Sequence, residues 1–226
     1  MRQNESGNVM FYILIAIVLL AALSYAISQG GRTSAQNLTG DRERLLATEI
    51  VDYADTVKKA VQMLRLRGSQ FSDLSFASDD LAGYGVPDTA PVHEIFNTAG
   101  GAVIYKAPDN AALALPSDWI FTATNEVENI GTTSGAADNA DLLMILQPLT
   151  KNVCVSLNDR LGVTNPAGDP PADADVDTTV PFTGSPGFAQ TIGNEAGSAA
   201  LAGHNAGCFR ETASGNYYFY QVLLAR

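Results

Sequence analysis

The sequence predicts an α+β protein in which one long N-terminal helix packs on an antiparallel β-sheet. Three observations point to this fold class. An uncharged apolar run extends from Val9 to Ile27, a pattern with helical spacing follows it, and short strand-like runs separated by turn residues fill the remainder. The part beyond residue 68 is long enough for one domain with its own core.

The apolar run from Val9 to Ile27 is long enough to cross a membrane as a helix. At about 1.5 Å per residue it would rise roughly 28 Å, close to the about 30 Å hydrocarbon core of a bilayer. A secretory signal has a shorter apolar region of about 7–15 residues, although small residues between Ala22 and Ser28 leave cleavage there as an alternative. We therefore expect residues 8–28 to form a retained transmembrane helix.

A second helical pattern follows the stretch QGGRTSAQNLTG. Each of its glycines lowers helix stability by about 1 kcal/mol relative to alanine, so we expect the helix to loosen or break here. Apolar residues then recur three or four positions apart, which is the spacing of one helix face. They are Leu46, Ile50, Tyr53, Val57, Val61 and Leu64. Gly68 is a natural stop, so residues 29–68 are predicted to form a hinge and an amphipathic helix.

Residues 69–226 are predicted to form an extracytoplasmic, β-rich globular domain. Short runs rich in aliphatic and aromatic residues indicate antiparallel strands. They lie at 102–105, 119–124 and 142–146. The turn sequence Ser214-Gly215-Asn216 between apolar segments predicts a β-hairpin at the C-terminal end.

The sequence between these strand signals predicts one short helix and one long loop. Apolar residues four positions apart favour a helix from Thr150 to Leu161, closed by Gly162. Residues 163–207 are rich in Gly, Pro, Ala, Asp and Thr, which is typical of a loop region. Cys154 and Cys208 lack CxxC spacing, so a disulfide that closes this loop region is expected if the chain leaves the cytoplasm, with a buried pair of free thiols as the alternative.

The charge of the chain excludes one functional class. With 13 Lys+Arg against 24 Asp+Glu, the net charge of −11 repels phosphate backbones. No nucleic-acid partner is expected.

The order of these features resembles type IV pilins and the pseudopilins of type II secretion. The specific part of the resemblance is Ser6-Gly7-Asn8-Val9-Met10-Phe11, where a short leader ends in glycine immediately before the apolar run. In that family a prepilin peptidase cuts after the glycine and methylates the new N-terminus, which implies cleavage between Gly7 and Asn8 and a leader of residues 1–7. The apolar helix would then anchor the chain in membrane lipid and later form the core of a filament.

Small residues in the apolar run favour close packing between helices. They are Ala16, Ala21, Ala22 and Ser24. Tyr12 stands where the family has a glutamate that pairs with the charged N-terminus of a neighbour, and Asn8 stands where phenylalanine is usual. A neutral phenol cannot neutralise an ammonium group, and an unpaired charge in hydrocarbon costs at least about 2.5 kcal/mol. This departure favours a minor subunit that assembles beside another pilin-like chain.

The sequence patterns for other binding or catalytic sites are incomplete. Asp173, Asp175 and Asp177 alternate like the first half of a calcium loop, but the glycine and glutamate that complete such a loop are missing, so we expect no metal and a solvated acidic loop. His93 and His204 lack the partners of a metal or nucleophile site. No catalytic motif is visible, and we expect neither an enzyme nor a cofactor.

These observations lead to one expectation for function and to its alternatives. We expect a pilin-like minor structural subunit of a type IV pilus or secretion pseudopilus. It would lie in the inner membrane with its C-terminal domain in the periplasm, and in a cell-surface filament after assembly. Its partners would be other pilin-like subunits and the prepilin peptidase. A solitary membrane-anchored ligand-binding protein is the main alternative, and an exported enzyme is the other.

Overall fold

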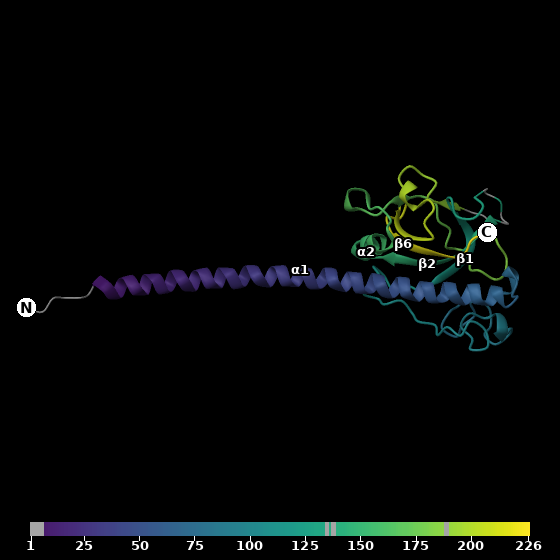
Figure 1. Cartoon of the computed structure of the whole chain (residues 1–226), viewed down its shortest axis with the longest axis horizontal. Helices are drawn as coiled ribbons and strands as arrows, with labels where there is room; N and C mark the ends of the chain where they lie inside the picture. The colour runs from purple at the N-terminus through teal and green to yellow at the C-terminus, as the bar shows by residue number, and fades with distance from the viewer. Residues whose placement is uncertain (1–6, 134–135, 137–138, 188–189) are drawn as a thin grey trace, which may run out of the picture. The chain divides into compact units, whose positions relative to one another are not determined.

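The computed structural model describes residues 7–133, 136, 139–187 and 190–226. The chain divides into two units, Met1–Arg42 and Glu43–Arg226. Helix α1 (Gly7–Leu66) contributes to both, and Figure 1 shows the course of the chain. The predicted break at the glycine-containing stretch is wrong, because α1 continues through Gly30, Gly31 and Gly40. A glycine weakens a helix by only about 1 kcal/mol and, unlike proline, removes no backbone hydrogen bond.

Among its described residues, the second unit contains the end of α1, the helix α2 (Lys151–Leu161) and six strands. The strands are β1 (Ile120–Val127), β2 (Asp141–Leu149), β3 (Ala172–Asp173), β4 (Gln190–Ile192), β5 (Ala206–Glu211) and β6 (Tyr217–Leu224). Their order across the sheet is β3-β5-β6-β2-β1-β4. The C-terminal strand β6 therefore lies in the interior of the sheet, between β5 and β2. Figure 1 shows β6 beside β2.

The sheet is mixed. The pairs β1/β2, β2/β6 and β5/β6 are antiparallel, whereas β4 and β3 lie parallel to β1 and β5 at the two edges. The six strands form a nearly closed, barrel-like sheet. The predicted fold class, a long N-terminal helix packed on an antiparallel sheet in the manner of a pilin, is therefore wrong, and this sheet argues against a pilin fold.

Both faces of the sheet are buried, which explains the continuous apolar sequence of β2. Leu142, Met144 and Leu146 belong to one core cluster, and the alternating Leu143 and Ile145 belong to a second one on the opposite face. The first cluster also contains the predicted apolar positions of α1 from Leu46 to Leu64, with Tyr53 packed against it. The second cluster contains Val127, Ile192, Phe209, Tyr220 and Val222.

Several local predictions are confirmed. Helix α2 ends at Gly162, which adopts a left-handed conformation with φ of 75°, as expected for a glycine C-cap. The antiparallel pair β5/β6 flanks Ser214–Asn216 and forms the predicted hairpin. The strand predicted at 102–105 is absent from the described structure. Ala102 has φ of 54°, and a Cβ on Gly101 would lie 2.5 Å from the carbonyl oxygen of Ile95, so the chain turns tightly here.

The segment 163–207 is not one long loop. It contains β3 and β4, which form the two parallel edges of the sheet. These strands are only two and three residues long, so they leave no alternating pattern in the sequence.

Candidate functional site

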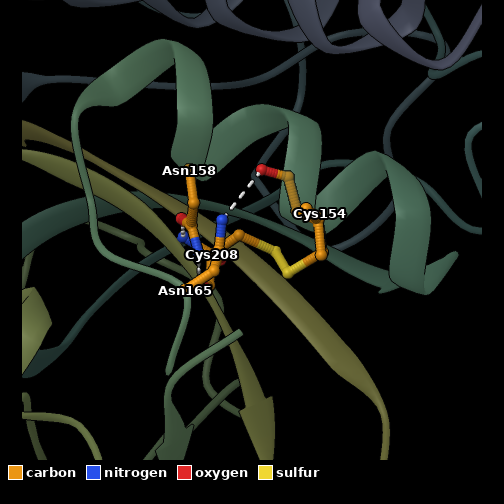
Figure 2. Close-up of a disulfide and its surroundings, with 5 residues drawn as sticks. Cys154, Asn158, Asn165 and Cys208 are labelled. Atoms are coloured by element: carbon orange, nitrogen blue, oxygen red, sulfur yellow. Dashed lines mark hydrogen bonds between the residues drawn. A yellow bond between two sulfur atoms is a disulfide. The ribbon is translucent and has the colours of Figure 1, made fainter. Parts of the chain in front are cut away.

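The predicted disulfide between Cys154 and Cys208 is confirmed. Its sulfur atoms are bonded, and the two Cα atoms are 5.4 Å apart. Both cysteines are fully buried in the first core cluster. Figure 2 shows the bond joining α2 to β5, next to Asn158 and Asn165. The disulfide therefore joins the helix before the segment 163–207 to the strand that follows most of it.

The apolar part of α1 is the largest exposed apolar feature among the described residues. Every described side chain from Met10 to Tyr25 is exposed. The large ones are Met10, Phe11, Tyr12, Ile13, Leu14, Ile15, Ile17, Val18, Leu19, Leu20, Leu23 and Tyr25. Burying one such side chain is worth roughly 1.5–3 kcal/mol. Consecutive residues of a helix cover all of its sides, so apolar side chains are exposed around the whole circumference of this segment.

The predicted helix-packing residues fall within this exposed segment. Ala16, Ala21, Ala22 and Ser24 are exposed like their larger neighbours, as is Tyr12. The predicted processing site lies at the other end of the same element, because Gly7 and Asn8 are the first two residues of α1. Whether the chain is cut there stays a prediction.

Among the described residues, no helix offers a stretch that is both long enough and apolar enough to span a membrane. The predicted transmembrane helix over residues 8–28 is therefore corrected. The predicted inner-membrane location, with a periplasmic domain and a later surface filament, is corrected on the same ground.

The acidic loop brings together two of its three predicted carboxylates and one that the sequence does not indicate. Oxygen atoms of Asp173, Asp175 and Glu195 lie within 4.8 Å of one another. Asp173 is fully buried, and its carboxylate accepts hydrogen bonds from the backbone N–H groups of Asp175 (2.8 Å) and Gly193 (2.7 Å). Each oxygen of the buried carboxylate therefore has a hydrogen-bond partner within the protein.

Asp177 lies outside this group. Its carboxylate accepts bonds from the backbone N–H and the hydroxyl of Thr179, at 2.9 and 2.6 Å. Burial raises the pKa of Asp177, but these hydrogen bonds to the ionised form outweigh it and leave the pKa below its usual value. Glu195 follows Asp173 by more than twenty residues, and no motif in the sequence links them.

Each of the two histidines has a hydrogen-bonding neighbour within the protein. The Nδ1 atom of His93 lies 2.8 Å from the hydroxyl oxygen of Ser69. The backbone carbonyl of His204 accepts a 3.0 Å hydrogen bond from the hydroxyl of Tyr220, a buried residue of the second core cluster. Neither histidine belongs to the carboxylate group described above.

A buried carboxylate lies where β1 and β2 meet the last residue of the chain. Asp141 accepts 3.0 Å hydrogen bonds from the backbone N–H groups of Val127 and Arg226. Burial, with a smaller contribution from the nearby charge of Glu126, raises the pKa of Asp141 to about 6, against the opposing effect of these two bonds. No sequence pattern singles out this residue, because an aspartate at the start of a strand has no distinctive neighbours.

Two clefts in the second unit differ in the residues that line them. A cleft of about 310 Å³ is bordered by the acidic residues Asp79, Asp80 and Asp88 and by the aromatic rings of Phe96 and Tyr105, among others. The other cleft, of about 280 Å³, lies between α1 and α2. It is lined by Arg44, Thr48, Ser156, Asp159 and Arg160. We call it the α1–α2 cleft.

Three comparisons with known proteins found no match to this chain. No protein-family model, no curated protein and no solved structure matches the chain.

Proposed function

We propose that this chain is a structural subunit of a multi-subunit assembly, in which the exposed apolar part of α1 packs against the same segment of neighbouring subunits. The observation that carries the proposal is the complete exposure of the apolar side chains from Met10 to Tyr25. Removing such an apolar surface from water lowers the free energy of the system and so favours association. The small residues Ala16, Ala21 and Ala22 allow neighbouring helices to approach closely.

The resemblance of residues 6–11 to the pilin leader supports a pilin-like way of assembling, although the globular fold differs from that of a pilin. Helices that pack through different faces of the same segment make heterologous contacts, which do not need to close into a ring. An interior subunit of such an assembly must find a partner for the charge at its N-terminus. Because Tyr12 carries no negative charge, we propose a minor subunit that forms short oligomers alone and longer ones beside a subunit that supplies a carboxylate.

A matched pair of charge insertions tests the role of the apolar segment. Leu20 and Leu115 are similarly exposed, at 65% and 67%, but only Leu20 lies in α1. Leu20→Glu should abolish self-association, because a carboxylate within packed apolar helices loses its hydration without gaining a partner. Leu115→Glu should associate like the unmodified chain. The measurement is sedimentation velocity of the full chain over a concentration series.

Two results would contradict this function. One is an unmodified chain that stays monomeric at every concentration, both alone and with other pilin-like chains. The other is a Leu20→Glu variant that associates as strongly as Leu115→Glu, which would place the contact elsewhere.

A further inference from the structure

The cleft of about 310 Å³ combines aromatic rings with carboxylates, and we call it the aromatic–acidic cleft. All of its lining residues lie in the irregular segment between α1 and β1. Its volume is in the range of small-molecule binding sites. The residues described along its lining include four carboxylates but no Lys, Arg or His. A ligand in this cleft therefore meets a negative electrostatic potential that no nearby cation offsets.

Phe96 and Tyr105 supply the aromatic part of the lining. Their ring centroids are 5.4 Å apart, and the two ring planes are nearly perpendicular, at 85°. The ring of Phe96 also packs against the core rings of Phe76 and Phe121, with centroids 6.3 and 5.9 Å away. These contacts hold Phe96 in place at the cleft. The face of an aromatic ring carries partial negative charge and attracts organic cations.

Two of the four carboxylates are part of the framework of the cleft. Glu94 is only 2% exposed, and its carboxylate accepts hydrogen bonds from the backbone N–H groups of Asp88 (3.0 Å) and Ala90 (3.1 Å). The amide of Asn97 donates to the carboxylates of both Glu94 (3.1 Å) and Asp88 (2.6 Å). The positions of these two carboxylates are therefore fixed by the fold.

The other two carboxylates, those of Asp79 and Asp80, are exposed. Within the part of the chain that the structure describes, neither forms a hydrogen bond or an ion pair. The four carboxylates of the cleft also do not converge as the ligands of a metal ion do. Among the described residues, the one such convergent group lies outside the cleft and consists of Asp173, Asp175 and Glu195. Separated carboxylates beside aromatic rings suit a cation that is larger than a metal ion.

We propose that the aromatic–acidic cleft binds a small organic cation that carries an alkylated ammonium group. Asp79 and Asp80 attract its charge, and the rings of Phe96 and Tyr105 contact its alkyl groups. None of the lining residues belongs to the exposed apolar segment of α1 from Met10 to Tyr25. This inference therefore goes beyond the proposed function and does not depend on it.

Choline and its uncharged isostere, in which a carbon atom replaces the nitrogen, test the charge of the ligand. Isothermal titration calorimetry of the full chain at low salt should show saturable binding of choline and no binding of the isostere. The two molecules have nearly the same shape, but only choline is attracted by carboxylates and by ring faces. Absence of choline binding, or equal binding of both molecules, would overturn the proposal.

Two double variants test the place of binding. Asp79→Asn with Asp80→Asn should weaken the binding of choline at least fivefold, because it removes the two carboxylates that have no partner within the described structure. The matched control is Asp52→Asn with Asp169→Asn, which makes the same change in net charge at two exposed positions outside the cleft. The control should bind choline like the unmodified chain. Equal weakening in both variants would reduce the effect to net charge and overturn the site.

A third variant tests the aromatic part of the cleft. Phe96→Leu keeps an apolar side chain but removes the ring, so it should also weaken the binding of choline. Its near-ultraviolet circular dichroism and urea denaturation would be compared with those of the unmodified chain to establish that it is folded. A folded Phe96→Leu variant that binds choline as tightly as the unmodified chain would contradict the proposed contact with the rings, and with it the site.

Discussion

The side-chain amide of Asn158 in α2 forms two hydrogen bonds with the backbone of Cys208 in β5. Its nitrogen donates to the Cys208 carbonyl and its oxygen accepts from the Cys208 N–H, each at 2.8 Å. Edge strand β3 pairs only with Arg210 and Glu211, so Cys208 lies beyond the end of that strand. Asn158 therefore takes the place of a strand partner, beside the disulfide that joins the same two elements (Figure 2).

This arrangement predicts a large effect of Asn158→Ala. The substitution leaves the buried N–H and carbonyl of Cys208 without partners, and each unsatisfied group costs about 1–3 kcal/mol. We expect the free energy of unfolding to fall by about 2–4 kcal/mol, measured by urea denaturation with the disulfide intact. Asn152→Ala is the control, because the Asn152 amide is exposed and bonds only Glu43 in the described structure. Equal effects of the two variants would contradict the role assigned to Asn158.

Removal of the disulfide tests how strongly the segment 163–207 depends on it. Cys154 and Cys208 are separated by 54 residues, and the chain-entropy model gives about 4 kcal/mol for a loop of that length, an upper value. The double variant Cys154→Ala with Cys208→Ala should lower the free energy of unfolding by about 2–4 kcal/mol in urea. Its folding can be followed by the circular dichroism of the aromatic residues. A loss below about 0.5 kcal/mol would show that the segment is held by its other contacts.

The elements that the sequence predicted well are those with a local signal. The apolar spacing in α1, the glycine after α2 and the turn at Ser214–Asn216 each lie within the element that they specify. The parallel edges were missed because β3 and β4 are too short to show a pattern and pair with strands far away in the sequence. Glu195 and Asn158 were missed for a related reason, since a polar residue in a loop or helix does not reveal which distant backbone it meets.

Asp141 predicts an unusual pH dependence of stability. Its pKa in the folded protein is raised to about 6, from an ordinary value of 3.8. Between these two values the folded state binds more protons than the unfolded state, so this group stabilises the fold at low pH, and the contribution is lost as the pH rises to about 6. Because of this loss, the melting temperature should fall between pH 4 and 6. We expect Asp141→Asn to abolish the fall. The melting temperatures of the unmodified chain and of Asp141→Asn would be measured at pH 4, 5, 6 and 7. Parallel dependence on pH in the two proteins would contradict the assignment of this effect to Asp141.

Carboxylates with lowered pKa values act in the opposite direction and at lower pH. Asp177 is one of them, and its contribution is lost as the pH falls below the ordinary range of an aspartate. Asp177→Asn should therefore change stability at pH 7 and leave the slope between pH 4 and 6 unaltered. This variant is the control for Asp141→Asn.

The last prediction concerns the junction between Gly7 and Asn8, where α1 begins. If the leader of residues 1–7 acts like the pilin leader that it resembles, the mature chain begins at Asn8 with a methylated amine. Gly7→Val should then leave an uncut chain, because the cut in the family that it resembles follows a glycine. Mass spectrometry of the intact protein from its native cells distinguishes the two forms. An unmodified chain that still begins at Met1, or one cut near Ser28, would rule out this processing, and with it the part of the proposed function that rests on the leader.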